Sequence, residues 1–340
     1  MEKVHIKTYN GGHFEYPAKR YILSKIFPEF YIKNINEVHN KPSPKDIIVH
    51  LFLSFAEKNF ESNGFKNYVY KTNETGKVAV FELDERFEKD IVIFFSGESW
   101  DVDCVPFNSD NNIIVFSPFR ENREKGVFQM YWIAICFIQF YLRNYIYKYQ
   151  NNKLECIKQK EHLFVYCNSN KTKERTQFMT KLVQMYTTHN KQSEIYCIGG
   201  HKIEGASTKN IERFSSPSCV LVDEYSKYKF AVVFENCEKT GYITEKLLQA
   251  FIANAIPIYW GDHENAKTFF NPEAFICVRD FESYEACIDY IYKMSDTDIT
   301  NMLMQPMFKD NKIPEQFNIE NFDTGYYGEI KKYVRDLYFK

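Results

Sequence analysis

The sequence has no large excess of positive or negative charge, and its first residues form no hydrophobic segment. Lysine and arginine total 43 against 45 acidic residues, for a formal net charge of −2. A chain without a global positive field is not expected to bind nucleic acid or an anionic membrane, so any anion site must be local. The first ten residues contain no apolar run of the signal-peptide type, and we expect a cytoplasmic protein.

Metal-binding and disulfide patterns are also missing. None of the nine cysteines forms a CxxC pair, and several lie in apolar runs, so we expect reduced, buried thiols. The eight histidines show neither HxH nor HExxH spacing. We therefore expect neither a disulfide framework nor a structural zinc site.

No apolar stretch reaches the length that a membrane-spanning helix needs. Residues 127–142 are apolar except for Gln129 and Gln139, but a span takes about 20 such residues. We expect a buried helix here and no stable membrane span. Contact of this segment with a membrane surface, as in a peripheral membrane protein, stays open as the alternative.

The pattern of short apolar runs predicts an α/β protein of two domains. In the first half, strands are predicted at residues 4–9, 46–54, 77–83, 90–95 and 112–116, with a helix at 17–26. The polar segment 147–161 marks the boundary. We expect domains at 1–150 and 151–318, followed by a helix within 319–340.

The second half alternates strands and helices more clearly. Strand 163–167 leads into a helix whose apolar side chains recur at helical spacing, and strand 194–198 follows. Strand 229–234, helix 242–254 and strand 256–260 then form a βαβ unit, which implies a right-handed parallel crossover. Parallel sheets bind ligands at the carboxyl ends of their strands, and phosphates favour the helix N-terminus that follows.

One lysine lies near a predicted helix N-terminus, where a positive charge is unfavourable. Lys246 lies near the start of the predicted helix, where a cation opposes the helix dipole by about 0.3–1 kcal/mol. An anion bound there would explain it. By position alone, a solvated lysine on an exposed face is equally compatible.

Several ordered blocks resemble the signature of the α1,3/4-fucosyltransferases, glycosyltransferase family 10. The blocks are residues 228–236 (YKFAVVFEN), 241–246 (GYITEK), 255–261 (AIPIYWG), 270–272 (FNP) and 280–281 (DF). Together they cover more of the chain than any single glycine motif would. The resemblance extends more weakly toward residue 90.

The resemblance implies a GT-B enzyme with two Rossmann-like domains facing a cleft. The C-terminal domain would hold GDP-fucose, and the N-terminal domain would meet the acceptor glycan and pack against the last helix. Carried onto matching positions, Lys246 and Arg175 would bind the diphosphate and Glu245 the ribose or fucose hydroxyls. Asn236 and Tyr242 would line the donor pocket. Arg175 starts a predicted helix after a strand and a turn, which fits an anion clamp, although an exposed arginine is the alternative.

The resemblance also implies an inverting transfer of L-fucose from GDP-β-L-fucose to a hydroxyl, O3 of GlcNAc or glucose, which forms an α-fucoside. The catalytic base would be Glu98, three residues beyond strand 90–95, although Ser96 and Ser99 depart from the family pattern around it. The cationic pair can stabilise the leaving group, so no divalent metal or other cofactor is required.

Other interpretations remain open from sequence. The triplet Asp101-Val102-Asp103 resembles the metal-nucleotide motif of other transferases but lies in the presumed acceptor domain. His201 either borders the nucleotide or is an ordinary loop residue. The chain could use another nucleotide sugar, or be an inactive glycan-binding relative. No sequence pattern identifies the acceptor glycan or the oligomeric state.

Overall fold

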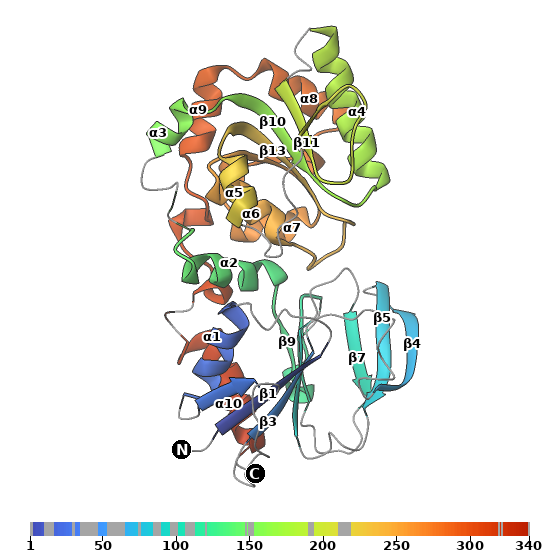
Figure 1. Cartoon of the computed structure of the whole chain (residues 1–340), viewed down its shortest axis with the longest axis vertical. Coiled ribbons are helices and arrows are strands. Elements are labelled where there is room, and N and C mark those ends of the chain that lie inside the picture. Colours follow the sequence, from blue (N-terminus) through green and yellow to red (C-terminus); the bar gives the residue numbers. More distant parts are fainter. Residues whose placement is uncertain are drawn as a thin grey trace. The chain divides into compact units, whose positions relative to one another are not determined.

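The chain forms two compact units, residues 1–142 with 315–340, and residues 143–314. The computed structural model describes residues 3–9, 17–28, 31–34, 47–52, 65–73, 76–83, 90–95, 101–105, 113–119, 121–146, 148, 153–189, 194–209, 219–318, 320 and 322–338. Figure 1 shows both units.

The first unit contains a six-stranded sheet in the order β2-β1-β3-β6-β8-β9. Every strand pair in it is parallel. The strands are β1 (Lys3–Tyr9), β2 (Tyr31–Asn34), β3 (Ile47–Phe52), β6 (Ile91–Phe95), β8 (Ile113–Ser117) and β9 (Val127–Gln129). A parallel sheet needs crossover connections and covered faces.

Three helices share a core with this sheet. They are α1 (Pro17–Ile26), α2 (Trp132–Leu142) and α10 (Gly325–Tyr338). Ile22, Ile138 and Ile330, one from each helix, belong to the same buried apolar cluster as the strands. The last helix of the chain therefore completes the core of the unit that contains the first strand.

The segment predicted as one helix, residues 127–142, divides into two elements. Its first residues form edge strand β9, in which Phe128 is buried and pairs with Phe116 of β8. The helix starts only at Trp132. Among the described residues, no helix has the combined length and hydrophobicity of a membrane span.

A separate three-stranded sheet belongs to the first unit. The antiparallel strands β4 (Phe65–Asn73) and β5 (Gly76–Leu83) pair as a hairpin, and β7 (Asp101–Val105) adds parallel to β5. The Asp101-Val102-Asp103 triplet therefore lies within a strand. Aspartate is depleted in strands, which is why the sequence did not predict β7.

The second unit is built on a parallel six-stranded sheet in the order β12-β11-β10-β13-β14-β15. The strands are β10 (His162–Cys167), β11 (Ile195–Ile198), β12 (Ser207–Lys209), β13 (Tyr228–Phe234), β14 (Ile256–Trp260) and β15 (Ile276–Cys277). Strands β10 and β13 are neighbours near the centre, so the segments that leave their carboxyl ends lie beside each other.

Helices pack around this sheet. They are α3 (Lys153–Lys158), α4 (Lys173–Thr188), α5 (Cys219–Tyr225), α6 (Glu245–Ile252), α7 (His263–Phe269), α8 (Tyr284–Lys293) and α9 (Asp296–Met304). Phe178 of α4, Ile288 of α8 and Leu303 of α9 join the buried apolar cluster of the strands. Helices α5 and α6 contact each other and strand β13. Helices α4 and α6 thus start at the edge where β10 and β13 end.

Candidate functional site

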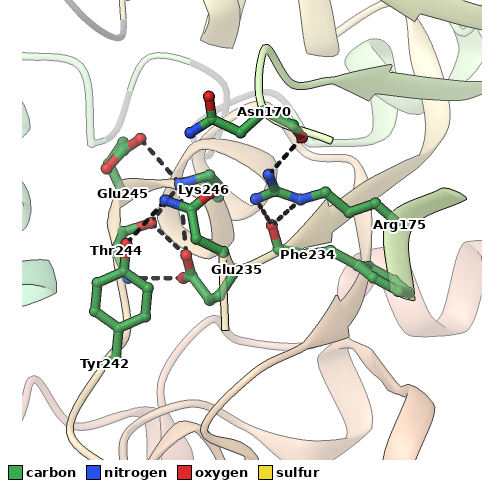
Figure 2. A network of polar contacts seen from close by, with 9 residues as sticks. Asn170, Arg175, Phe234, Glu235, Tyr242, Thr244, Glu245 and Lys246 are labelled. Atoms are coloured by element: carbon green, nitrogen blue, oxygen red, sulfur yellow. Dashed lines mark hydrogen bonds and ion pairs between the residues drawn. The ribbon is translucent and has the colours of Figure 1, made fainter. Parts of the chain in front are cut away.

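The carboxyl ends of β10 and β13 bring together all five residues predicted to bind the donor. Arg175 lies in the first turn of α4, which follows β10. Asn236 and Tyr242 lie on the loop after β13, and Glu245 and Lys246 lie in the first turn of α6. Figure 2 shows Arg175, Tyr242, Glu245 and Lys246 around Glu235, the first residue after β13. The predicted base, Glu98, lies outside the described residues.

Arg175 is buried, with 1% of its surface exposed. Its Nε and Nη2 atoms donate to the carbonyl oxygen of Phe234 at 3.2 and 2.5 Å, and Nη1 donates to that of Asn170 at 3.0 Å. Among the described residues, no carboxylate lies within ion-pair distance of this guanidinium. A buried charge is normally paired with an opposite one, so a guanidinium with only carbonyl partners is suited to bind an anion.

Lys246 is held mainly by Glu235, the residue after Phe234, whose carbonyl oxygen accepts from Arg175. Its Nζ lies 3.5 Å from Oε2 of Glu235 and 3.6 Å from Oε1 of Glu245. It also donates to Oγ1 of Thr244 at 2.9 Å. Thr244 in turn donates its hydroxyl and its backbone N–H to the two oxygens of Glu235, each at 2.7 Å. Lys246 therefore has a fixed position in the first turn of α6 (Figure 2).

These contacts explain where α6 begins. The sequence predicted a helix from residue 242, but the observed helix starts at Glu245. The hydroxyl and N–H of Thr244, the residue before it, are both bound by the buried carboxylate of Glu235. Tyr242 therefore belongs to the loop and not to the helix.

At Lys246 and Glu235, burial and the neighbouring opposite charges shift the pKa in opposite directions. Burial lowers the pKa of Arg175, although arginine keeps its proton in proteins. Burial disfavours the ammonium of Lys246 too, but the carboxylates of Glu245 and Glu235 outweigh it and raise the pKa of Lys246. Burial raises the pKa of Glu235, against the opposing effects of Lys246 and Thr244. Both cations are therefore charged at neutral pH.

The loop between β13 and α6 is fastened at three points. Nδ2 of Asn236 donates to Oη of Tyr242 at 3.3 Å. The backbone N–H of Gly241 donates to Oδ2 of the buried Asp262 at 2.5 Å. Glu238 accepts from Nε of Arg279 at 2.7 Å. A loop held in this way can keep Asn236 and Tyr242 in place beside the two cations.

This arrangement favours binding of a phosphate group. Two cations and the starts of two helices, α4 and α6, occupy one edge of a parallel sheet, where free N–H groups and the helix dipoles attract anions. The carboxylates of Glu235 and Glu245 balance part of that charge. Among the described residues, no group of three acidic, histidine or cysteine side chains is placed to bind a metal ion.

Sequence comparison identifies the domain that carries this edge. Residues 156–303 match the family model described as glycosyltransferase family 10 (fucosyltransferase) C-term. The matched region contains all five of the residues assembled here. This part of the chain is similar to the C-terminal domain of the family 10 fucosyltransferases. The resemblance seen in the sequence blocks is thereby confirmed.

Curated relatives match over short stretches. The chain is 48% identical to the alpha-(1,3)-fucosyltransferase FucT of Helicobacter pylori over 66 residues, which cover 19% of this chain and 14% of FucT. It is 35% identical to the putative fucosyltransferase R654 of Acanthamoeba polyphaga mimivirus over 107 residues, 29% of this chain and 18% of R654. Human 4-galactosyl-N-acetylglucosaminide 3-alpha-L-fucosyltransferase FUT6 is 34% identical over 104 residues, 30% of this chain and 29% of FUT6. The matches thus span less than a third of each relative.

Solved structures share the fold of the chain. A crystal structure of alpha1,3-fucosyltransferase with GDP aligns at a TM-score of 0.56 and 17% identity, covering 99% of this chain and 89% of that one. The same type of enzyme with GDP-fucose aligns at 0.56 and 16% identity, covering 99% and 90%. The predicted fold class, GT-B with two Rossmann-like α/β domains, is confirmed.

Sequence reasoning missed the residues that hold the predicted donor-binding residues in place. Glu235 lies in one of the sequence blocks but had no predicted role, and Asp262 lies outside the blocks. A carboxylate that directly ends an apolar strand was the available signal for Glu235. No local pattern indicated that Asp262 would contact Gly241, since 21 residues separate them.

Proposed function

We propose that this chain is an inverting fucosyltransferase. It transfers L-fucose from GDP-β-L-fucose to a hydroxyl of an acceptor glycan, O3 of GlcNAc or glucose, and forms an α-fucoside. The observation that carries the proposal is the buried guanidinium of Arg175, which has carbonyl but no carboxylate partners among the described residues, beside the charged Lys246.

The donor assignment rests on the match between this charge and a nucleoside diphosphate. Arg175 and Lys246 bind the diphosphate, Glu245 binds hydroxyls of the ribose or fucose, and Asn236 and Tyr242 line the pocket. We infer the fucose and the guanine of the donor by analogy with the structurally similar alpha1,3-fucosyltransferase, which was crystallised with GDP-fucose. Arginine suits this task because its planar fork binds phosphate oxygens in pairs.

The reaction exchanges one bond for another at the anomeric carbon. The acceptor oxygen attacks C1 of fucose from the face opposite the β-phosphate while the bond from C1 to the phosphate oxygen breaks. The electron pair leaves with GDP, and Arg175 and Lys246 stabilise the charge that develops there. Because one displacement occurs, the β-linked donor yields an α-fucoside. No divalent metal takes part.

Glu98 accepts the proton of the attacking hydroxyl. It follows β6 by three residues, and β6 is an interior strand of the parallel sheet of the first unit. Carboxyl ends of such strands are where α/β proteins place catalytic groups. The conjugate acid then releases its proton to solvent.

Replacement of the base separates binding from chemistry. In Glu98→Gln, calorimetry should show GDP-fucose binding like that of the wild type. Fucose transfer from labelled GDP-fucose should fall by at least about 100-fold, the usual effect of losing a general base. The acceptor for this assay comes from a glycan array incubated with the wild type and labelled donor.

Two outcomes would contradict the proposal. Unchanged transfer by Glu98→Gln would refute the base assignment. Wild-type transfer from another nucleotide sugar, without binding of GDP-fucose, would refute the donor assignment. Glycan binding without any turnover would instead indicate an inactive relative.

A further inference from the structure

His201 lies in the loop after β11 and is buried, with 1% of its surface exposed. Its Nδ1 atom is 2.6 Å from Oη of Tyr166 on β10, and its Nε2 atom is 3.3 Å from Oγ1 of Thr176 on α4. The imidazole therefore connects the central strand to the first turns of the helix that carries Arg175.

The neighbouring contacts determine the tautomer of this imidazole. The Thr176 hydroxyl donates to the backbone oxygen of Thr172 at 2.8 Å, so its oxygen is left to accept from Nε2–H of His201. Nδ1 then carries no proton and accepts from Oη of Tyr166. Burial and the charges of Lys171 and Arg175 lower the pKa of His201, which supports the neutral ring.

The contacts of Thr176 lead directly to Arg175. Thr172, the N-cap of α4, accepts the N–H of Arg175 at its side-chain oxygen, at 3.3 Å. Its backbone oxygen accepts both the hydroxyl and the N–H of Thr176, at 2.8 and 3.1 Å. The first turn of α4 is therefore tied to Tyr166 through Thr176 and His201.

We propose that His201 is a positioning residue, which fixes the first turn of α4 through Thr176 and so sets the guanidinium of Arg175 for the donor diphosphate. The inference rests on the proposed function, in which Arg175 binds that diphosphate. His201 itself touches neither phosphate nor sugar. Tyr166 orients the ring, and Thr176 passes the constraint to the helix.

Thr176 offers the cleanest variants because its side chain is exposed and its replacement leaves the core intact. Thr176→Val keeps the shape and removes the hydroxyl, whereas Thr176→Ser keeps the hydroxyl. Calorimetric titration with GDP should show about threefold to tenfold weaker binding for Thr176→Val, the effect of one neutral hydrogen bond. Thr176→Ser should stay within about twofold of the wild type.

Two amides of different length probe the imidazole itself. The side-chain nitrogen of glutamine reaches about as far as Nε2, so His201→Gln should keep the contact with Thr176 and most of the GDP affinity. Asparagine reaches only as far as Nδ1, so His201→Asn should lose affinity as Thr176→Val does. Thermal melting of each variant reports whether the fold is retained.

A double-mutant cycle with Arg175→Lys distinguishes positioning from general stabilisation. If Thr176 acts through the guanidinium, Thr176→Val should weaken GDP binding by less than about twofold in the Arg175→Lys background. Wild-type affinity in Thr176→Val, or an undiminished loss in the Arg175→Lys background, would overturn the inference. A wild type that binds no GDP would instead refute the proposed function.

Discussion

Glu235 is the residue on which the position of Lys246 depends. Its side chain is fully buried and contacts Lys246 directly and through Thr244. The raised pKa of Lys246 means that the folded state favours its charged form. This stabilisation is therefore fully present below the ordinary lysine pKa, and it is lost only as the pH rises through the higher folded value.

Replacement of Glu235 by glutamine should destabilise the second unit. Glu235→Gln removes a buried charge and leaves Lys246 with the more exposed Glu245 as its partner. Loss of one member of a buried pair costs about 3–5 kcal/mol, so the free energy of unfolding in urea should fall by roughly that amount. The matched control is Glu245→Gln, whose side chain is 30% exposed and should cost less than about 1 kcal/mol. Equal losses in the two variants would contradict the distinction between them.

At this scale, the sequence indicated the residues that could carry chemistry but not their partners. The strand–helix pattern and the resemblance predicted Arg175 and Lys246 at the starts of two helices that follow strands, and both lie there. The carbonyl of Phe234 that accepts from Arg175 could not be predicted, because backbone groups leave no trace in residue identity. His201 was equally compatible with two environments, since burial of a loop residue depends on distant segments.

Among the elements, the βαβ unit from β13 to β14 shows how closely packed the site is. Strand β14 ends at Trp260, and Gly261 follows it. A Cβ atom at Gly261 would lie 2.5 Å from Oη of Tyr259 and 2.7 Å from Cγ of Glu235. Such distances are below van der Waals contact, so the position accepts only glycine without movement of Glu235.

Gly261→Ala should therefore disturb both stability and the site. Overpacking of a well-packed region costs about 1–3 kcal/mol, and displacement of Glu235 should also weaken GDP binding. Urea denaturation and calorimetry measure the two effects. Gly200→Ala serves as the control, because its Cβ would meet nothing closer than 3.5 Å. If Gly261→Ala is as stable as Gly200→Ala, the packing of Glu235 against Gly261 is not tight.

Elements with a clear period were predicted from sequence, and short or atypical ones were not. The apolar runs of β10 and β13 and the helical stripe of α4 match the observed elements closely. The segment 127–142 misled the prediction because an all-apolar run has no period that separates strand from helix. Strand β7 was missed because its two aspartates contradict strand propensity.

At the scale of the whole molecule, packing between segments that are distant in the sequence was the feature least predictable from sequence. Helix α10 packs Ile330 and Val334 into a core with α1, although these segments lie at opposite ends of the chain. An amphipathic pattern shows that a helix buries one face but not against what. That return of the chain was expected only from the family resemblance.

The central claim for the molecule is that its second unit binds the diphosphate of GDP-fucose through Lys246 and Arg175. The direct test is calorimetric titration of GDP-fucose into the wild type, Lys246→Ala and the control Lys293→Ala. Lys293 is exposed on α8 and pairs only with Asp289 among the described residues. Loss of a charge that contacts phosphate should weaken binding by about 100-fold or more in Lys246→Ala, and Lys293→Ala should stay within about twofold. Wild-type affinity for GDP-fucose in Lys246→Ala would contradict the claim.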